Sequence, residues 1–339
     1  MSARVAILGA SGFVGGELLR LCASHPLLEP VFLAGDSNAG ARVGEIHPHL
    51  AIAYPDAVIE RFNPDALAGI DLVLAVLPHG HSQKLAPAIV ERGIAFVDLG
   101  ADFRLRDAEA YERWYGEAHQ APELLDRFVY GIPEIDRAAI RGAKCVAAAG
   151  CFPTAAVLAL KPLIDAGLVK AGGIVVDAAS GVTGAGRMLK EATAFATVAE
   201  SFAAYGLISH RHTAEMEACL GAQILFTPHL APMNRGILAT CYATATGEME
   251  ADAPTKALRA AYAGEPFIHV SDAPPSTKWT LGSNAVHITA RFDERTGRVL
   301  AIAALDNLVK GAAGQMIQCA NLMLGFDESD GLTACGVYP

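Results

Sequence analysis

The stretch RVAILGASGFVGGELLR, residues 4–20, decides the fold. Val5–Leu8 is a short apolar run typical of a buried parallel strand, and Phe13–Ala23 has the apolar spacing of a helix. Between them the glycines of Gly9–Gly15 let the backbone approach a pyrophosphate, and the helix start offers free N–H groups. The spacing is GxxGxxG rather than GxGxxG, so the position between strand and helix carries the prediction of a dinucleotide-binding loop. An ordinary strand-to-helix turn is the alternative.

The residues that follow continue the same alternation of strand and helix. Because short buried strands separated by amphipathic helices form right-handed crossovers, we expect a Rossmann-like, doubly wound parallel sheet, an α/β fold. Residues 101–131 are irregular and rich in charge and aromatic rings, which indicates a surface lobe. The expected strands are Pro30–Ala34, Leu72–Leu77, Ala95–Asp98 and Lys144–Ala148, with a helix at Lys84–Arg92.

A second region with longer strands begins at Cys151. Few helices separate these strands, which favours a mixed or antiparallel sheet with helices on one face, an α+β domain. The expected strands are Gly173–Ala178, Ile224–Thr227, Ile237–Ala245, Val286–Arg291 and Val299–Leu305, followed by a helix at Gly311–Leu324. We therefore expect a dinucleotide-binding domain at 1–150, completed by about 308–339, and a catalytic and oligomerisation domain at 151–307.

Composition narrows the classes of function. The chain has 339 residues, 52% of them hydrophobic and 18% charged, so a sizeable core can be buried. A net charge of −10 without a cluster of Lys or Arg argues against nucleic acid as a partner. We see no secretion signal and no apolar run long enough for a membrane span. Seven cysteines without CxxC pairing fit a reducing, cytoplasmic compartment.

The end of the second expected strand bears on the choice between NAD and NADP. Asp36 lies 21 residues after Gly15, close to the spacing of an acid that binds the ribose 2′-OH of NAD. Ser37 and Asn38 follow, and the first cation is Arg42. Taken alone, this pattern favours NAD, because a carboxylate repels the 2′-phosphate of NADP. A structural Asp in the turn Gly35–Asn38 is the competing interpretation.

One cysteine differs from the other six. Cys151 stands in Gly150-Cys151-Phe152-Pro153-Thr154, where Gly150 permits a sharp turn and Pro153 suits the first turn of a helix. A thiol at a helix N-terminus has a lowered pKa, and the nearby N–H groups can stabilise an oxyanion. The sequence therefore predicts Cys151 as a nucleophile. The other six fit helix, strand or tail positions as packed or surface thiols.

A histidine segment is the candidate proton partner for this thiol. His210-Arg211-His212-Thr213 precedes a helix in which Thr213 is the expected N-cap and Glu215 could orient an imidazole. His47/His49, His79/His81 and His210/His212 are spaced for a metal site, but no HExxH motif or cluster of Cys ligands accompanies them. We expect no metal.

Taken together, these motifs resemble the N-acetyl-γ-glutamyl-phosphate reductases, semialdehyde dehydrogenases of arginine biosynthesis. Ten segments fall in the family's order over nearly the whole chain. They are GASGFVG at 9–15, PHL at 48–50, LPHGHS at 77–82, DLGADFRL at 98–105, YGIPE at 130–134, GCFPT at 150–154, SGVTGAGR at 180–187, HRHTAEM at 210–216, PHLAPMNRG at 228–236 and DNLVKGAAGQ at 306–315.

The resemblance implies a role for each motif. Cys151 would form a thioester with a carboxyl-phosphate substrate, and His210 would act as acid and base. The implied cofactor contacts are Gly9, Ser11, Gly12, Phe13, Val14, Ser37, Ser180, Gly181 and Asn307. The implied substrate contacts are His212 and Glu215, with Arg104 and Arg235 added because Arg clamps phosphate and carboxylate bidentately.

The resemblance also implies a fold and partners. It implies a second domain like that of glyceraldehyde-3-phosphate dehydrogenase, NADP(H) as cofactor, and assembly into a homodimer or homotetramer. The expected ligands are a small acyl phosphate, its semialdehyde and inorganic phosphate. The chain departs from the family at Ala149 and Ala214, where Pro is common, and at Ser37-Asn38, which lack the expected cations, so NAD(H) stays open.

Other functions stay open at this point. Aspartate-semialdehyde dehydrogenase shares the chemistry, although its cysteine motif differs from GCFPT. A reductase of a carrier-linked aminoacyl phosphate is closer. A redox sensor that binds a dinucleotide without turnover is the alternative from another class.

Overall fold

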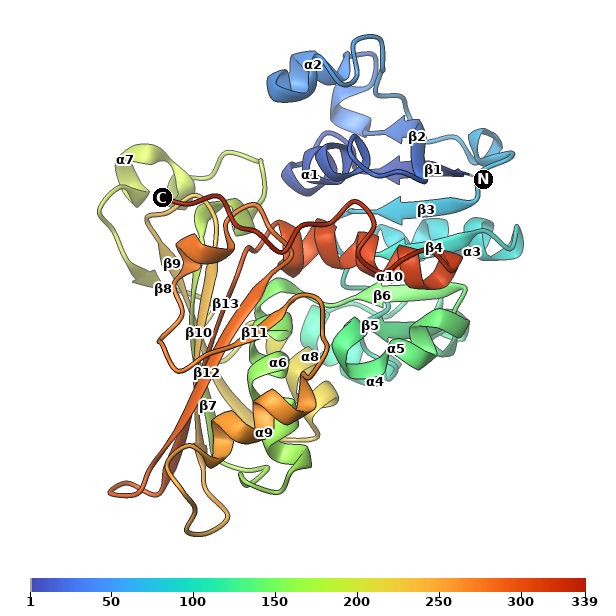
Figure 1. The fold of residues 1–339 in the computed structure, drawn as a ribbon. Coiled ribbons are helices and arrows are strands. Elements are labelled where there is room, and N and C mark those ends of the chain that lie inside the picture. The colour runs from blue at the N-terminus through green and yellow to red at the C-terminus, as the bar shows by residue number, and fades with distance from the viewer. Residues whose placement is uncertain (1) are drawn as a thin grey trace. The chain divides into compact units, whose positions relative to one another are not determined.

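The computed structural model describes residues 2–339 and divides them into two compact units. Unit 1 comprises residues 1–149 and 312–332, and unit 2 comprises 150–311 and 333–339. The chain returns from unit 2 to unit 1 at Ala312, close to the expected position of about 308. The last seven residues group with unit 2. Figure 1 shows the elements of both units along the chain.

Unit 1 is built on a parallel sheet of six strands in the order β2-β1-β3-β4-β6-β5. Every neighbouring pair is parallel. The order reverses between β1 and β3, and the carboxyl ends of strands at such a reversal form the ligand crevice of doubly wound folds. The strands are β1 (Ala3–Leu8), β2 (Leu28–Ala34), β3 (Leu72–Ala75), β4 (Ala95–Asp98), β5 (Phe128–Gly131) and β6 (Cys145–Ala148).

Helices connect these strands and cover the sheet. α1 packs on β1 and β2, α3 on β4, and α10 on β4, β5 and β6. α10 comes from the far end of the chain and also packs on α1 and α5, so the last helix completes unit 1. The helices are α1 (Phe13–Cys22), α2 (Val43–Ile46), α3 (Ser82–Glu91), α4 (Ala108–Tyr115), α5 (Pro133–Gly142) and α10 (Gly314–Leu324).

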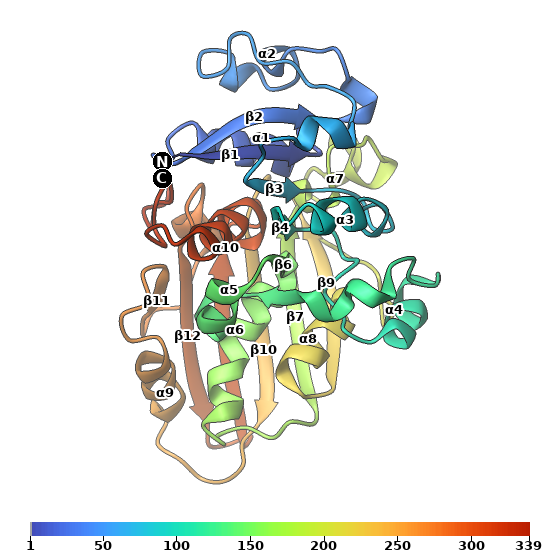
Figure 2. The same ribbon diagram turned by 90° about the vertical axis from the view of Figure 1, so that its right-hand side faces the viewer.

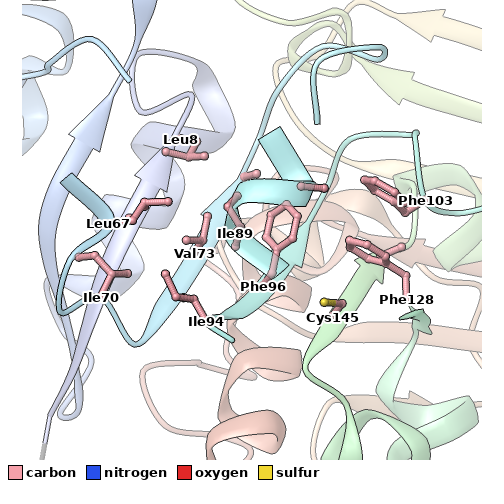
Figure 3. Close-up of a cluster of buried hydrophobic side chains, with 14 of the residues drawn as sticks. Leu8, Leu67, Ile70, Val73, Ile89, Ile94, Phe96, Phe103, Phe128 and Cys145 are labelled. Atoms are coloured by element: carbon pink, nitrogen blue, oxygen red, sulfur yellow. The ribbon is translucent and has the colours of Figure 1, made fainter. Parts of the chain in front are cut away.

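A cluster of buried side chains lies between the sheet and these connections (Figure 3). Phe103 and Phe128 stack with ring centres 3.9 Å apart, and Phe96 meets Phe128 edge-on. Tyr111 is completely buried. The expected surface lobe at 101–131 is therefore wrong: this segment contributes Phe103 and Tyr111 to the interior and ends in strand β5 of the sheet.

Unit 2 is built on a mixed sheet of seven strands in the order β11-β12-β13-β10-β7-β9-β8. β12, β13, β10 and β7 are antiparallel neighbours, whereas β7–β9 and β11–β12 are parallel pairs. The strands are β7 (Ile174–Gly181), β8 (Ala203–Ala204), β9 (Ile224–Ala231), β10 (Ile237–Thr244), β11 (Ile268–Val270), β12 (Val286–Asp293) and β13 (Arg298–Leu305).

Helices pack on one face of this sheet. α6 (Cys151–Asp165) runs against β10, β12 and β13, with α8 (His212–Leu220) and α9 (Ala253–Ala261) beside it (Figure 2). α6 is apolar almost throughout and nearly all of it is buried, as expected for a helix enclosed on several sides. A short helix, α7 (Phe195–Val198), lies in the loop between β7 and β8.

The two expected folds are confirmed: a Rossmann-like domain with a parallel sheet and a second α+β domain with a mixed sheet. A π-helical turn at Val309–Ala313 leads from β13 into α10. Within residues 2–339, no helix combines the length and apolar character needed to cross a bilayer.

Candidate active site

Cys151 is the first residue of α6, as the sequence predicts. Gly150 is the N-cap with an extended backbone, and Thr154 Oγ1 donates to the Gly150 carbonyl at 2.9 Å. The thiol side chain is half-buried. Because the first N–H groups of a helix have no partner within it, the sulfur starts at a positive dipole end that stabilises a thiolate.

Glu215 fixes the turn before the nucleophile. Its Oε1 accepts the Gly150 N–H at 2.7 Å, and its side chain is 1% exposed. The bond joins the start of α6 to the first turn of α8 across 65 residues of chain. This contact orients the backbone that carries Cys151, and the expectation that Glu215 also orients an imidazole stays a prediction.

Gly311 packs against the nucleophile from the π-helical turn. A Cβ at Gly311 would lie 2.7 Å from Cys151 Cβ and 3.2 Å from its Cα. Neither atom is the far end of a flexible side chain, so an added methyl group would displace the start of α6. Sequence reasoning missed this residue. The motif DNLVKGAAGQ contains it, but only the fold brings position 311 to position 151.

We expect Gly311→Ala to lower kcat roughly 10- to 100-fold, because a shift of about 1 Å in a reacting group costs that much. Overpacking should also cost about 1–3 kcal/mol of stability. The rate of Cys151 alkylation by iodoacetamide, read by peptide mass spectrometry, measures the displacement directly. Gly172→Ala is the matched control, since a Cβ there meets nothing within 4 Å. Equal rates in both variants would contradict the contact.

An aromatic cluster at the start of α6 contains His210. The ring of Phe152, the residue after the nucleophile, has its centre 5.7 Å from that of His210. Phe226 on β9 contacts both rings edge-on. Burial, and then the charge of Arg211, lower the pKa of His210 to about 4. The imidazole is therefore neutral at physiological pH.

One hydrogen bond fixes the tautomer of His210. Its Nδ1 accepts the backbone N–H of His212 at 3.2 Å. An acceptor nitrogen carries no proton, so the neutral ring holds its proton on Nε2. Nε2 is thus a hydrogen-bond donor in the resting protein.

Tyr205 is a further residue of this cluster that sequence reasoning missed. Its ring centre is 5.6 Å from that of His210. Burial and then the charge of Cys151 raise the pKa of Tyr205. Gly206 follows with φ of +55°, and a Cβ there would approach the His210 ring at 3.3 Å.

The start of α8 differs from the expectation. The helix begins at His212 with Arg211 as N-cap, so Thr213 lies inside the first turn and is not the cap. His212 is half-buried, with its ring 4.8 Å from that of His210 and 5.9 Å from that of Phe152. The predicted His210 and His212 therefore contact each other and Phe152, the residue that follows Cys151.

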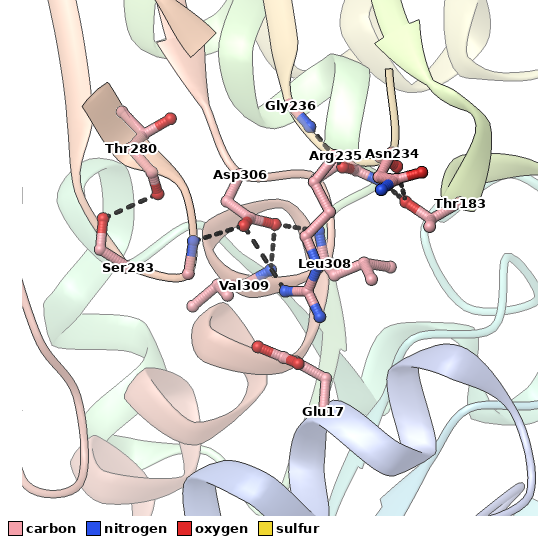
Figure 4. Close-up of polar contacts among 12 residues, drawn as sticks. Glu17, Thr183, Asn234, Arg235, Gly236, Thr280, Ser283, Asp306, Leu308 and Val309 are labelled. Atoms are coloured by element: carbon pink, nitrogen blue, oxygen red, sulfur yellow. Dashed lines mark hydrogen bonds and ion pairs between the residues drawn. The ribbon is translucent and has the colours of Figure 1, made fainter. Parts of the chain in front are cut away.

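A polar network in unit 2 contains two more of the predicted residues, Arg235 and Asn307 (Figure 4). Asp306 is fully buried and accepts the backbone N–H groups of Gly282, Leu308 and Val309. Arg235 Nη1 lies 3.6 Å from Asp306 Oδ2, and the Arg235 side chain keeps 26% exposure. The carboxylate therefore holds a cation that remains partly open to solvent.

Asn307 joins the loops around this network. Its Oδ1 accepts the Gly236 N–H at 2.8 Å, and its Nδ2 donates to Thr183 Oγ1 at 3.0 Å. Ser180, at the end of β7, donates to the Gly181 carbonyl at 3.0 Å. A Cβ at Gly181 would approach Asn234 O at 2.7 Å, so this loop packs too closely for a larger residue. These contacts brace the loops that the sequence predicts to contact the cofactor.

The glycine loop of unit 1 follows β1 as predicted. Gly9 has φ of +88°, and a Cβ there would collide with the Val76 carbonyl oxygen. Gly12 is the N-cap of α1, and Gly15 packs against Gly9 and Ala10. His47 braces the loop, because its Nε2 bonds Ala10 O at 2.9 Å and its ring fills the space beside Gly16. Sequence reasoning treated His47 only as half of a His-x-His pair.

The remaining predicted positions of unit 1 lie in the segments that follow β2 and β4. Asp36 and Ser37 are exposed in a turn directly after β2. Arg104 is 8% exposed, and its Nη2 donates to Leu99 O at 2.7 Å. Asp98, at the end of β4, accepts from Ser82 Oγ at 2.7 Å, and burial raises its pKa to about 7.

Comparison with known protein families matches both regions of the chain. Residues 4–143 match the family model described as semialdehyde dehydrogenase, NAD binding domain. Residues 151–307 match the model described as semialdehyde dehydrogenase, dimerisation domain. A relative from Symbiobacterium thermophilum, named N-acetyl-gamma-glutamyl-phosphate reductase, is 48% identical over the full length of both chains. Relatives of the same name from Acidothermus cellulolyticus and Pelotomaculum thermopropionicum are 47% and 43% identical, again over both full lengths.

Solved structures with similar folds include aspartate-semialdehyde dehydrogenases. The Vibrio cholerae enzyme II superposes with a TM-score of 0.73 at 19% identity, covering 96% of this chain and 99% of that one. The Candida albicans enzyme, solved with NADP, gives 0.64 at 15% identity, covering 95% and 98%. At these identities the likeness shows the fold alone.

Proposed function

The chain belongs to the N-acetyl-gamma-glutamyl-phosphate reductase family of semialdehyde dehydrogenases, and from this premise we propose its reaction. It reduces N-acetyl-L-glutamyl 5-phosphate to N-acetyl-L-glutamate 5-semialdehyde and releases phosphate, a step of arginine biosynthesis. The observation that carries the proposal is Cys151 at the start of α6 with His210 in the adjoining aromatic cluster.

Unit 1 has the features of a dinucleotide site. The Gly9–Gly15 loop leaves no space for side chains at Gly9 and Gly15, while Gly12 meets only one atom, at 3.5 Å, which is ordinary contact. A backbone packed this closely on Val76 and on the loop itself, ahead of the first N–H groups of α1, suits a pyrophosphate. The bound nicotinamide supplies the hydride.

The covalent step belongs to Cys151. The thiolate attacks the acyl carbon, a C–S bond forms, and the C–O bond to phosphate breaks, so that phosphate leaves and a thioester remains. After hydride arrives at the same carbon, the C–S bond breaks, which releases the aldehyde and restores the thiolate. Gly150, held by Glu215, and Gly311 keep the sulfur in place throughout.

His210 stabilises the charge that develops on the substrate oxygen. The oxygen is negative both when sulfur attacks and when hydride arrives, and Nε2–H is the available donor because Nδ1 accepts from His212. The one proton that the reductive direction consumes ends on the released phosphate, so Nε2–H stabilises the oxyanion without giving up its own proton. In the oxidative direction the same Nε2–H stabilises the oxyanion that forms when sulfur attacks the aldehyde, whereas the acid and base role expected from the sequence requires the other tautomer, with Nε2 unprotonated.

Arg235 is our candidate for the anionic groups of the substrate in unit 2. Its guanidinium is held by the buried Asp306 and stays partly exposed, so it can clamp a carboxylate or phosphate. His212, beside His210, is the accompanying polar contact. Arg104 is almost fully buried and bonds a backbone carbonyl, so a substrate would have to reach it inside unit 1.

For the cofactor we propose NADP(H). Ser37 and Asn38 follow β2 in an exposed turn and offer a hydroxyl and an amide donor to a 2′-phosphate. Arg42 ends the same segment with 62% of its side chain exposed. The carboxylate of Asp36 would repel a 2′-phosphate, and for NADP(H) we expect this exposed side chain to turn towards solvent.

We further propose a homodimer or homotetramer formed through unit 2. The segment 186–209 and the outer sides of β9 and β10 expose large apolar side chains, and such a surface is typical of an interface. The most exposed are Met188, Leu189, Phe195, Phe202, Leu207, Ile208 and Leu225, each between 56% and 93% exposed. Sedimentation velocity of the full chain tests this, and a purely monomeric profile would contradict it.

A thiol nucleophile must stay reduced, which supports a cytoplasmic location.

An assay of N-acetylglutamate semialdehyde oxidation tests substrate and cofactor together. We expect turnover that requires inorganic phosphate and that is faster with NADP⁺ than with NAD⁺ at equal concentrations. Aspartate semialdehyde serves as the control substrate and should be a poor one. Oxidation without phosphate, or a preference for aspartate semialdehyde, would contradict the reaction; a preference for NAD⁺ would overturn only the choice of cofactor.

A further inference from the structure

Three pairs of imidazoles approach each other within the described residues. The ring centres are 6.0 Å apart for His47 and His49, 4.8 Å for His210 and His212, and 5.0 Å for His269 and His287. In the first two pairs a ring nitrogen is already engaged, by Ala10 O and by the His212 N–H respectively. Within residues 2–339, neither His269 nor His287 forms a hydrogen bond or ion pair through its ring.

His269 and His287 face each other across two strands of unit 2. β11 and β12 are parallel, and their register places His269 directly opposite His287. Directly opposed residues project from the same face of a sheet, on backbones about 4.8 Å apart. The two histidines are 18 residues apart in sequence, so no short sequence motif indicates the pair.

We propose that His269 and His287 form a binding site for a divalent transition-metal ion of the kind that prefers imidazole, such as Zn²⁺, Ni²⁺ or Cu²⁺. Metal–nitrogen bonds are about 2.0–2.1 Å long, which puts each ring centre about 3.2 Å from the ion. Two imidazoles at roughly 90–110° about one ion then have ring centres about 4.5–5.2 Å apart. The observed 5.0 Å lies in this range.

The surroundings leave room for the rest of the coordination shell. An open hollow of about 360 Å³ adjoins both imidazoles, between β11, β12 and Ala334 of the C-terminal tail. No group of three or more His, Cys, Asp or Glu side chains gathers as ligands within the described residues, so the ion keeps water in its other positions.

Binding would fasten the edge of the sheet. β11 is three residues long and pairs only with β12. An ion held by one imidazole from each strand joins them, and any ligand that binds the folded state alone also stabilises it. Trp279 has its ring centre 5.8 Å from that of His287, so its fluorescence reports on the site.

The test is a Ni²⁺ titration of the full-length protein followed by tryptophan fluorescence. The chain has two tryptophans, so Trp114→Phe leaves Trp279 as the reporter. We expect saturable quenching with one Ni²⁺ per chain. In His269→Gln and in His287→Gln the affinity for Ni²⁺ should be lower by about tenfold or more. The loss follows because the second imidazole of a pair binds at a high effective concentration.

His229→Gln is the matched control, since this half-buried imidazole of the same unit stacks on Phe202 and has no part in the pair. Protection from diethylpyrocarbonate in the unaltered protein gives a measurement that needs no variant: Ni²⁺ should protect His269 and His287 together. An absence of saturable quenching would overturn the proposal. Quenching that both substitutions leave unchanged would also overturn it, because it would show adventitious binding elsewhere.

Discussion

Cys151→Ser is expected to lower kcat by about 10⁴-fold or more, because a serine hydroxyl at neutral pH is a far weaker nucleophile than a thiolate. The helix start that stabilises a thiolate cannot ionise an alcohol whose pKa is much higher. Binding of NADPH should be unchanged, since Cys151 is not among the residues expected to contact the cofactor. Steady-state kinetics and a fluorescence titration of NADPH measure the two quantities.

Cys219→Ser is the matched control for this substitution. Cys219 is also partly exposed and lies in unit 2, but burial raises its pKa to about 11, so its thiol is not activated. We expect this variant to keep its activity. If Cys151→Ser retained more than a few per cent of the rate while Cys219→Ser lost it, the assignment of the nucleophile would be wrong.

His210→Asn is expected to lower kcat about 10²- to 10³-fold, the usual cost of removing one donor to an oxyanion. KM should change little, because the donor acts on charge that develops during the reaction. His229→Asn, an imidazole of the same unit outside the aromatic cluster, should leave kcat unchanged. Rates near those of the unaltered enzyme would remove His210 from the mechanism.

The pH dependence gives an independent test of the His210 assignment. Burial lowers its pKa to about 4, so the neutral ring persists from alkaline pH down to that value. The ratio of kcat between the unaltered enzyme and His210→Asn should therefore stay constant from about pH 5.5 to 8. A ratio that changes steeply near pH 6.5 would show an imidazole that titrates at its ordinary value, contrary to the structure.

The sequence predicts those parts of the fold and site that depend on neighbouring residues. The strand at Ala95–Asp98 and the helix start at Cys151 were identified from apolar runs, glycine and proline, which act within a few residues. The Gly9–Gly15 loop is of the same kind, because its conformation depends on its own glycines. Its exact brace, His47, comes from 37 residues away and has no local signal.

The features that the sequence missed depend on contacts between distant segments. Strand β5 is four residues long and gains its stability from β6 and from Phe96 and Phe103. Gly311 meets Cys151 only because β13 and α6 pack together. Thr213 has the residue type of an N-cap, yet the N-cap is Arg211, two residues earlier, and helix ends are commonly uncertain by that much.

The central claim is a thioester on Cys151, and mass spectrometry of the acylated enzyme tests it most directly. The enzyme is mixed with N-acetylglutamate semialdehyde and NADP⁺ without phosphate, quenched in acid and digested. Because phosphate is needed to cleave the thioester, we expect the N-acetylglutamyl group to accumulate on the peptide that contains Cys151 and to disappear when phosphate is added before the quench. An enzyme that turns over normally but carries no acyl group, or carries it on another residue, would contradict the account.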